Sequence, residues 1–339
     1  QKIISEMPED SMARTVVQRS LEMVDDVIIA EAKIQPVEFR NDIKENGSAG
    51  MERAEVDAKM NDSSVNPAED HKSLTKWTTK EVDEVIDGGH AAALVMLLSS
   101  DHLSVRKEAA TNISKFAAKL KDSILEEKDQ IWLLLCEVVE TAKKSISQDP
   151  LPTVISAFAS HAIAVLNDPL HVLYAKINKF LSQGPTWDLD KIPLMHKILD
   201  QQPSVDDSHS AEISWLLICM LVGLRTTEDM SLYRKRFVFE KLLSVYNSTY
   251  LGAGLRDKIL RIIFRATRIE GGSTTLVTRF SAMTWLEAQA ALGGGMPLEM
   301  LMEKILESCD KKRVKKWSKG VREQGKSKLT GQSRGASYL

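Results

Sequence analysis

The sequence predicts an all-α protein built as an irregular helical-repeat solenoid, with a disordered N-terminal linker and a basic C-terminal tail. Helix-breaking residues divide residues 74–309 into segments of roughly 12–22 residues, an ordinary length for helices. Apolar residues recur in these segments at helical spacing, and no segment alternates apolar and polar residues beside a hairpin turn. The composition, 43% apolar and 27% charged, is sufficient for a sizeable core.

The N-terminal part of the chain differs in kind from the rest. Residues 1–40 include Val17, Leu21 and Val24 at helical spacing, which predicts a helical segment that could dock on the repeats. Residues 41–73 are acidic, polar and free of aromatic side chains. Such a segment buries too little apolar surface to offset its ordering entropy, so we expect a disordered linker. Because the first residue is glutamine, we also expect this chain to be part of a longer polypeptide or a gene model cut short at its start.

Short motifs that stop helices separate the predicted helices of residues 74–309. Proline lacks a backbone donor, and glycine has the conformational freedom to leave a helix. The breaks fall at Gly88-Gly89, 99–101, Asp149-Pro150, Asn167-Asp168-Pro169, Gln183-Gly184-Pro185, Gln202-Pro203, 252–254, Gly271-Gly272 and 293–295.

The segment that follows Asp101 resembles the second helix of a HEAT or armadillo repeat. Asp101 is a short polar residue able to cap a helix, and Val105 and Arg106 follow it as in such repeats. With the predicted helix at 80–98 it forms one helix pair. Such pairs cannot cover their own apolar faces and therefore stack. We expect residues 74–309 to form a HEAT-like domain, irregular because the later pairs show no clean consensus.

Cysteine usage and hydropathy exclude several classes of protein. Cys136, Cys219 and Cys309 are widely spaced and have no CxxC pattern, which argues against a disulfide framework or a zinc module and favours a reducing compartment. The longest apolar stretches fall far short of the roughly 18 residues of a membrane span. We therefore expect no membrane association.

Motifs of the common catalytic and cofactor sites are absent from the sequence. It contains no P-loop, no GxGxxG, no HExxH and no GxSxG. Its seven histidines are scattered, and none forms an i, i+3 or i+4 pair that would suit a metal. We therefore expect no enzymatic activity, no cofactor, no metal and no small-molecule substrate.

The C-terminal tail, residues 310–339, is the strongest functional signal. Residues 311–328 carry nine basic side chains and one acidic one, and like charges at this density repel within a fold but neutralise phosphates. We expect this tail to be mostly disordered and to bind RNA, with Trp317 as the one candidate for stacking on a base. A solvated tail without a partner is the alternative. The candidate RNA-binding residues are Lys311, Lys312, Arg313, Lys315, Lys316 and Lys319.

A second basic set lies on two predicted helices within the repeat region. Arg261, Arg265 and Arg268 repeat at i, i+4 and i+7 and therefore share one helix face. A basic stripe can be an electrostatic footprint for RNA or for an acidic protein, although a solvated helix face has the same pattern. The candidates here are Arg234, Lys235, Arg236, Arg261, Arg265 and Arg268.

Long ordered strings between about residues 80 and 264 resemble the C-terminal domain of the nucleolar pre-ribosomal-associated protein 1 family. They are VLNDPLHVLY (165–174), KINKFL (176–181), GP (184–185), WD (187–188), IPL (192–194), WLL (215–217), GLRT (223–226), DM (229–230), LYRKR (232–236), VFE (238–240) and LLS (242–244).

This resemblance implies a large, non-catalytic helical-repeat scaffold of the nucleolus that acts in early assembly of the large (60S) ribosomal subunit. It implies pre-rRNA and nucleolar assembly factors, including a DEAD-box RNA helicase, as partners, and a location in the nucleus and nucleolus. Two alternatives stay open at this point. A HEAT-like protein-protein adaptor without RNA binding would use the helical faces alone, and an enzyme of unfamiliar type would need a clustered set of titratable side chains.

Overall fold

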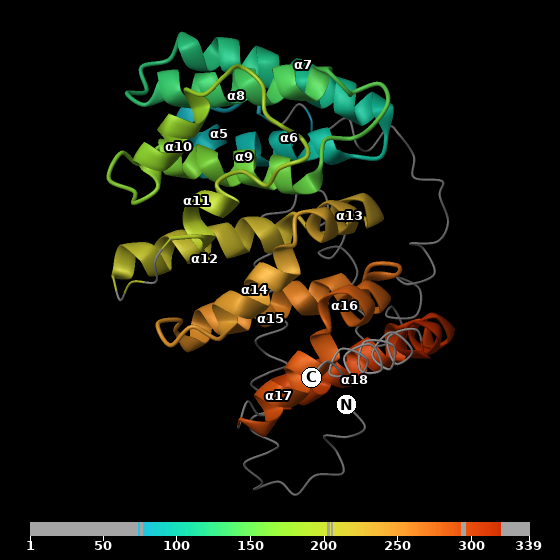
Figure 1. Cartoon of the computed structure of the whole chain (residues 1–339). Coiled ribbons are helices and arrows are strands. Elements are labelled where there is room, and N and C mark those ends of the chain that lie inside the picture. Colours follow the sequence, from blue (N-terminus) through green and yellow to red (C-terminus); the bar gives the residue numbers. More distant parts are fainter. Residues whose placement is uncertain (1–73, 75–76, 202–203, 205, 293–295, 320–339) are drawn as a thin grey trace, which may run out of the picture. The chain divides into compact units, whose positions relative to one another are not determined.

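A computed structural model describes residues 74, 77–201, 204, 206–292 and 296–319 (Figure 1). In this part of the chain every regular element is a helix, which confirms the predicted all-α, repeat-like fold. The described residues group into two compact units. The first extends to Gln201 and includes Asp206 to Gly223, and the second contains Ser204 and the described residues from Leu224 onward. The predicted N-terminal helix (1–40) and linker (41–73) lie outside the described residues.

The first unit opens with the predicted helix pair. Its first arm is split at Gly88-Gly89, where Gly89 has a φ of 71°, and its second arm, α7, packs on the first. Apolar side chains of α7, among them Ile113, Phe116 and Leu120, are fully buried against the neighbouring helices. The helices are α5 (Val82–Asp87), α6 (His90–Met96), the short 3-10 helix η2 (Leu97–Ser99) and α7 (Leu103–Lys121).

Arg106 of the HEAT-like pattern is buried and joins two loops. Its guanidinium donates to the carbonyl of Ile146 through Nε and Nη2, at 3.1 and 2.9 Å, and to the carbonyls of Ser100 and Asp101 through Nη1, both at 2.9 Å. The predicted cap at Asp101 is wrong, because His102 precedes the helix and no side chain caps it. The backbone carbonyl of Asp101 instead accepts a hydrogen bond from Arg106.

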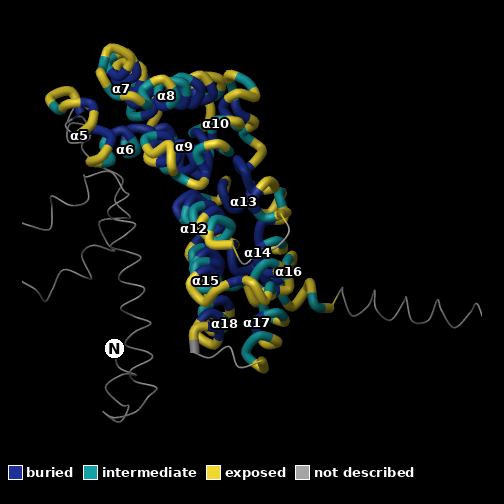
Figure 2. The backbone as a smooth tube through the Cα atoms, turned by 90° about the vertical axis from the view of Figure 1, so that its left-hand side faces the viewer, coloured by how far each residue is buried: buried dark blue, intermediate teal, exposed yellow. Residues whose placement is uncertain are grey.

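Helix α9 is the centre of the first unit, packing against α6, α8, α10 and α12. It is apolar on nearly every face, as a helix surrounded by others must be. Figure 2 shows how buried residues lie on the inner sides of the helices. The helices that follow α7 are α8 (Lys128–Lys143), α9 (Thr153–Leu166), α10 (Tyr174–Leu181), α11 (Met195–Leu199) and α12 (Asp207–Val222).

The long connection between α10 and α11 is fixed to α8 by Trp187. The indole Nε1–H donates to a carboxylate oxygen of Glu137 at 2.9 Å, and the backbone N–H donates to the Thr141 hydroxyl at 3.0 Å. Burial raises the pKa of Glu137, and the Trp187 bond opposes this shift. The Trp187 ring packs edge-on against Phe158 and Phe180, so it belongs to the core.

The second unit packs its helices around Tyr233, Phe239 and Leu276, all of which are fully buried. Its first helix has a capping box: the Thr226 hydroxyl accepts from the Asp229 N–H, and the Asp229 carboxylate accepts from the Thr226 N–H. Helix α18 contacts α15, α16 and α17. The helices are α13 (Thr227–Lys235), α14 (Val238–Tyr246), α15 (Ala253–Thr267), α16 (Gly272–Phe280), α17 (Ala282–Ala291) and α18 (Met296–Ser308).

The expectation of a disordered tail from residue 310 is wrong for residues 311–319, which form a helix. The Asp310 carboxylate caps this helix by accepting from the backbone N–H groups of Lys312 and Arg313, at 2.9 and 3.1 Å. Val314 and Ser318, one turn apart, are half-buried and face the rest of the unit. The cap and this contact face offset the repulsion among the lysines. Residues 320–339 lie outside the described part.

Candidate nucleic-acid interface

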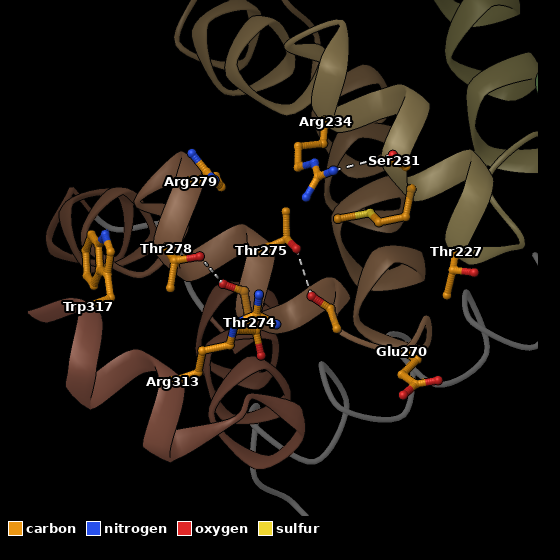
Figure 3. Close-up of a pocket in the computed structure, with 12 residues that line it drawn as sticks. Thr227, Ser231, Arg234, Glu270, Thr274, Thr275, Thr278, Arg279, Arg313 and Trp317 are labelled. Atoms are coloured by element: carbon orange, nitrogen blue, oxygen red, sulfur yellow. Dashed lines mark hydrogen bonds between the residues drawn. The ribbon is translucent and has the colours of Figure 1, made fainter.

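A cleft in the second unit gathers arginine side chains from three separate elements (Figure 3). Arg234 comes from the last turn of α13, Arg279 from the last turn of α16, and Arg313 from the 311–319 helix. The cleft has a volume of about 500 Å³. We call this set the arginine cleft. Its lining residues are Thr227, Met230, Ser231, Arg234, Glu270, Gly271, Thr274, Thr275, Thr278, Arg279, Arg313 and Trp317.

The arginines of the cleft keep most of their hydrogen-bonding capacity. Arg234 is exposed and donates through Nη2 to the Ser231 hydroxyl in a long bond of 3.4 Å. Among the described residues, neither Arg279 nor Arg313 has an ion-pair partner for its guanidinium. Glu270 is the one acidic side chain among the described residues that line the cleft. The surface therefore carries a local excess of positive charge.

Three threonines of α16 form a polar wall of the cleft. The hydroxyls of Thr275 and Thr278 donate to the carbonyls of Gly271 and Thr274, at 2.9 and 2.7 Å. Because their protons are used in this way, their oxygens are available as acceptors. Thr274 differs, since its hydroxyl oxygen accepts from the Asp310 N–H at 2.9 Å and its proton stays available.

The bond from Asp310 to Thr274 also positions the 311–319 helix. It joins the start of that helix directly to α16, next to a second bond between the hydroxyls of Ser273 and Ser308 at 2.7 Å. Arg313 and Trp317 are four residues apart, so both reach the same side of the helix and line the cleft. In Figure 3, Trp317 lies at one end of the cleft and Glu270 at the other.

The structure separates the sequence-predicted basic residues into two groups. Arg234 and Arg313 line the arginine cleft, although 79 positions separate them in the chain. Arg236 is half-buried, has an interaction of its own and does not line the cleft. The others are exposed cations that do not line it, namely Lys235, Lys311, Lys312, Lys315, Lys316 and Lys319.

The predicted stripe on α15 does not contribute to the cleft. Arg261 pairs with Asp257, with 2.6 Å between Nε and Oδ2, and the Arg268 guanidinium lies over the Phe264 ring at 5.0 Å from its centroid. Arg265 is half-buried and has an interaction of its own. Burial lowers the pKa of Lys258 on the same helix, and the neighbouring Arg261 charge adds to this. Part of this stripe is therefore committed to contacts within the unit.

Arg279 is the functional candidate that the sequence analysis misses. It stands alone among uncharged residues, so no count of clustered charges identifies it. A signal is nevertheless present. Thr274 and Thr278, and likewise Thr275 and Arg279, are four residues apart, which places all four on one polar side of a short helix.

In the described part of the chain, no group of three or more His, Cys, Asp or Glu residues is placed to hold a metal ion. None of the described helices has the length and apolar character that a membrane crossing requires. Cys136, Cys219 and Cys309 are free thiols, and burial raises the pKa of the first two.

Comparison with known proteins matches residues 91–285, more than half of the chain, to the family described as nucleolar pre-ribosomal-associated protein 1. The chain belongs to this family. Nucleolar pre-ribosomal-associated protein 1 of Saccharomyces cerevisiae is 26% identical over 216 residues, covering 56% of this chain and 12% of the relative. The proteins of the same name from Mus musculus and Homo sapiens are 25% and 22% identical over 201 residues, 59% of this chain and 9% of each. No solved structure matches.

Membership in the nucleolar pre-ribosomal-associated protein 1 family confirms the predicted nucleolar location, and the names of its members support ribosome biogenesis as the class of function. The chain spans about a tenth of the length of the curated relatives that it matches. The family match includes Arg234 and Arg279 of the arginine cleft, whereas Arg313 and Trp317 lie beyond its end.

Proposed function

We propose that this chain is part of a non-catalytic scaffold for early nucleolar assembly of the large (60S) ribosomal subunit, and that it contacts pre-rRNA through the arginine cleft. The observation that carries this proposal is the convergence of Arg234, Arg279 and Arg313 from three elements on one cleft. Family membership supports the nucleolar setting, and the cleft supplies the chemistry for binding a polyanion.

The geometry favours contact with phosphates over sequence readout. A guanidinium presents a planar fork of donors that matches phosphate oxygens, and it stays charged at any physiological pH. The net charge of the chain is −2, so attraction to RNA has to come from local concentrations of positive charge. Phosphate contacts hold an RNA in position without reading its bases, a property that suits a scaffold.

Nucleolar assembly factors, among them a DEAD-box RNA helicase, are the protein partners that we propose by analogy with the family. Stacked helices offer extended surfaces for such contacts. Two loop side chains of the first unit support protein binding: Ile124 is 98% exposed and Leu170 is 94% exposed. These two residues also favour the second candidate function, a protein-protein adaptor without RNA binding. An exposed apolar side chain at a loop tip stabilises a complex when a partner protein removes it from water.

The test is the affinity of the full chain for a structured fragment of large-subunit pre-rRNA at low and physiological salt. Arg234→Gln and Arg313→Gln each remove one cleft charge, and Lys235→Gln and Lys312→Gln remove one exposed charge from the neighbouring position outside the cleft. We expect the cleft variants to weaken binding several-fold more than their matched controls. Equal losses in both pairs, or no binding by the wild-type chain at low salt, would contradict the proposal and favour the adaptor.

A further inference from the structure

The six tryptophans of the chain differ in how their rings are used. Five have a ring or cation partner, and Trp317 has none among the described residues. Trp77 packs edge-on against Phe116, Trp187 against Phe158 and Phe180, Trp215 against Phe158, and Trp285 against Tyr246, while the Lys121 ammonium lies over Trp132.

Trp317, whose ring has no aromatic or cation partner among the described residues, also lies in an unusual place. Its side chain is 38% exposed and lies at the end of the arginine cleft, with Arg313 one helical turn before it. Figure 3 shows Thr278 and Arg279 of α16 near the same end. An exposed indole beside two guanidinium groups combines a π surface with phosphate-binding charge, which is how proteins hold single-stranded nucleic acids.

We propose that the arginine cleft holds one unpaired nucleotide of a single-stranded RNA, with the base stacked on Trp317 and the flanking phosphates bound by Arg313 and Arg279. This inference rests on the proposed function and adds the class of RNA that the cleft selects. A duplex is a poor ligand for such a site, because its bases are already stacked on one another and their faces are closed to a protein ring.

The remaining lining residues agree with this occupant. A volume of about 500 Å³ falls in the range of roughly 300–1,000 Å³ for sites that take small organic groups. The oxygens of Thr275 and Thr278 are acceptors for a ribose 2′-hydroxyl or a base amino group, because their protons are already donated to backbone carbonyls. The Glu270 carboxylate at the far end repels phosphate, which directs the anionic part of the ligand toward Trp317.

The experiment compares the full chain with two variants of Trp317 against RNAs that carry equal numbers of phosphates. Trp317→Leu keeps an apolar side chain without a π face, and Trp317→Phe keeps a smaller π face. The RNAs are a single-stranded oligonucleotide, a blunt duplex and a single strand with abasic positions. Free adenosine monophosphate is tested separately as a small ligand. Circular dichroism of each variant checks that the helical content is unchanged.

We expect the single strand to bind roughly 5- to 100-fold tighter than the duplex, and Trp317→Leu to remove that preference through a loss of the same size for the single strand. Trp317→Phe should retain most of the affinity, and the abasic strand should bind wild type as weakly as the normal strand binds Trp317→Leu. A duplex bound as tightly as the single strand, no loss in Trp317→Leu, or free adenosine monophosphate bound as tightly as the oligonucleotide would overturn the inference.

The failure of this inference is distinguishable from the failure of the proposed function. If Arg313→Gln weakens binding of every RNA alike while Trp317→Leu has no effect, the cleft binds phosphates and the stacking role is wrong. If neither single strand nor duplex binds at low salt, the proposed RNA contact itself is wrong.

Discussion

Arg106 is a cation whose guanidinium is used entirely within the fold. It is 4% exposed and donates to three backbone carbonyls in two loops. Replacing it with glutamine removes the charge and most of these donors, and leaves buried carbonyls without partners. We expect Arg106→Gln to lower the free energy of unfolding of the first unit by about 2–3 kcal/mol, measured by urea unfolding of the full chain followed by far-UV circular dichroism.

The matched control for Arg106 is its neighbour. Lys107→Gln removes one positive charge from the same helix at an exposed position, and we expect a change within about 0.5 kcal/mol. If both variants unfold at the same urea concentration, the buried hydrogen bonds of Arg106 contribute nothing beyond its charge, and our account of this residue is wrong.

His161 of α9 links the stability of the first unit to pH. Burial lowers its pKa from 6.5 to about 4, and its Nε2 atom has no partner in the described part of the chain. Between these two values the unfolded chain binds a proton that the folded chain does not, so folding is progressively destabilised as pH falls through 6.5. The loss is complete near pH 4 and reaches about 3 kcal/mol.

The pH dependence of His161 is measured as a difference between proteins. His161→Phe cannot bind a proton, so the unfolding free energy of wild type minus that of the variant should fall from pH 7 to pH 4 and stay constant above pH 7. A difference independent of pH would show that His161 is solvated in the folded protein.

At the scale of single residues, the sequence shows which chemistry a side chain offers better than it shows which role that side chain takes in the fold. Trp187 is buried although Thr186 and Asp188 flank it. Its core position follows from its contacts with Phe158 and Phe180. The special status of Trp317 follows from the lysines around it in the sequence. The role of Arg279 does not follow from its neighbours, because it depends on Arg234 and Arg313, which are remote in the chain. A cation gains its role from what faces it, and periodicity within one helix does not contain that information.

The turn between α15 and α16 is an element that the cleft depends on. A β-carbon on Gly272 would lie 1.9 Å from the Ala266 carbonyl oxygen, so any larger residue must displace backbone. This close approach sets where α16 begins and hence where its threonines and Arg279 lie. We expect Gly272→Ala to destabilise the second unit by about 2 kcal/mol or more and to weaken RNA binding, measured by thermal unfolding and by the affinity for RNA.

Gly254 provides the matched control for Gly272. It lies in the first turn of α15, and a β-carbon there would meet nothing within 4 Å. Gly254→Ala should therefore stabilise the protein by about 0.4–1 kcal/mol, since alanine restricts the unfolded chain, and it should leave RNA affinity unchanged. A loss of stability in Gly254→Ala as large as that in Gly272→Ala would contradict the role of the close approach.

At the scale of elements, the sequence locates the breaks between helices well. The break at Gly88-Gly89 is present in the structure. The density of basic residues at 311–319, in contrast, wrongly predicts a disordered segment. The 311–319 segment is helical despite its lysines because other interactions oppose their mutual repulsion. Those interactions are a capping carboxylate at Asp310, a half-buried contact through Val314, and the bond from Asp310 to α16. The first can be read from the sequence, and the last requires the fold.

At the scale of the whole molecule, the distribution of charge matters more for RNA binding than the net charge does. Residues 1–72 carry 16 acidic and 9 basic side chains, which nearly balances the basic C-terminal segment in a chain of net charge −2. The sequence therefore shows where charge is dense. It does not show that Arg234 and Arg279 join Arg313, because which helices meet is decided by apolar contacts between remote segments.

The salt dependence of RNA binding separates the cleft from the tail as the source of affinity. For single-stranded RNA the slope of log K against log salt is about −0.7 per phosphate contact. Three cleft arginines predict a slope of about −2, whereas all nine cations of residues 311–328 would give about −6. We expect the full chain to show the shallower slope, measured by fluorescence anisotropy over a salt series.

Arg279→Gln should reduce the magnitude of this slope by about 0.7, and Lys316→Gln should leave it unchanged. A slope near −6 that responds equally to both substitutions would assign the affinity to dispersed tail charge, since only a defined cleft distinguishes one cation from another.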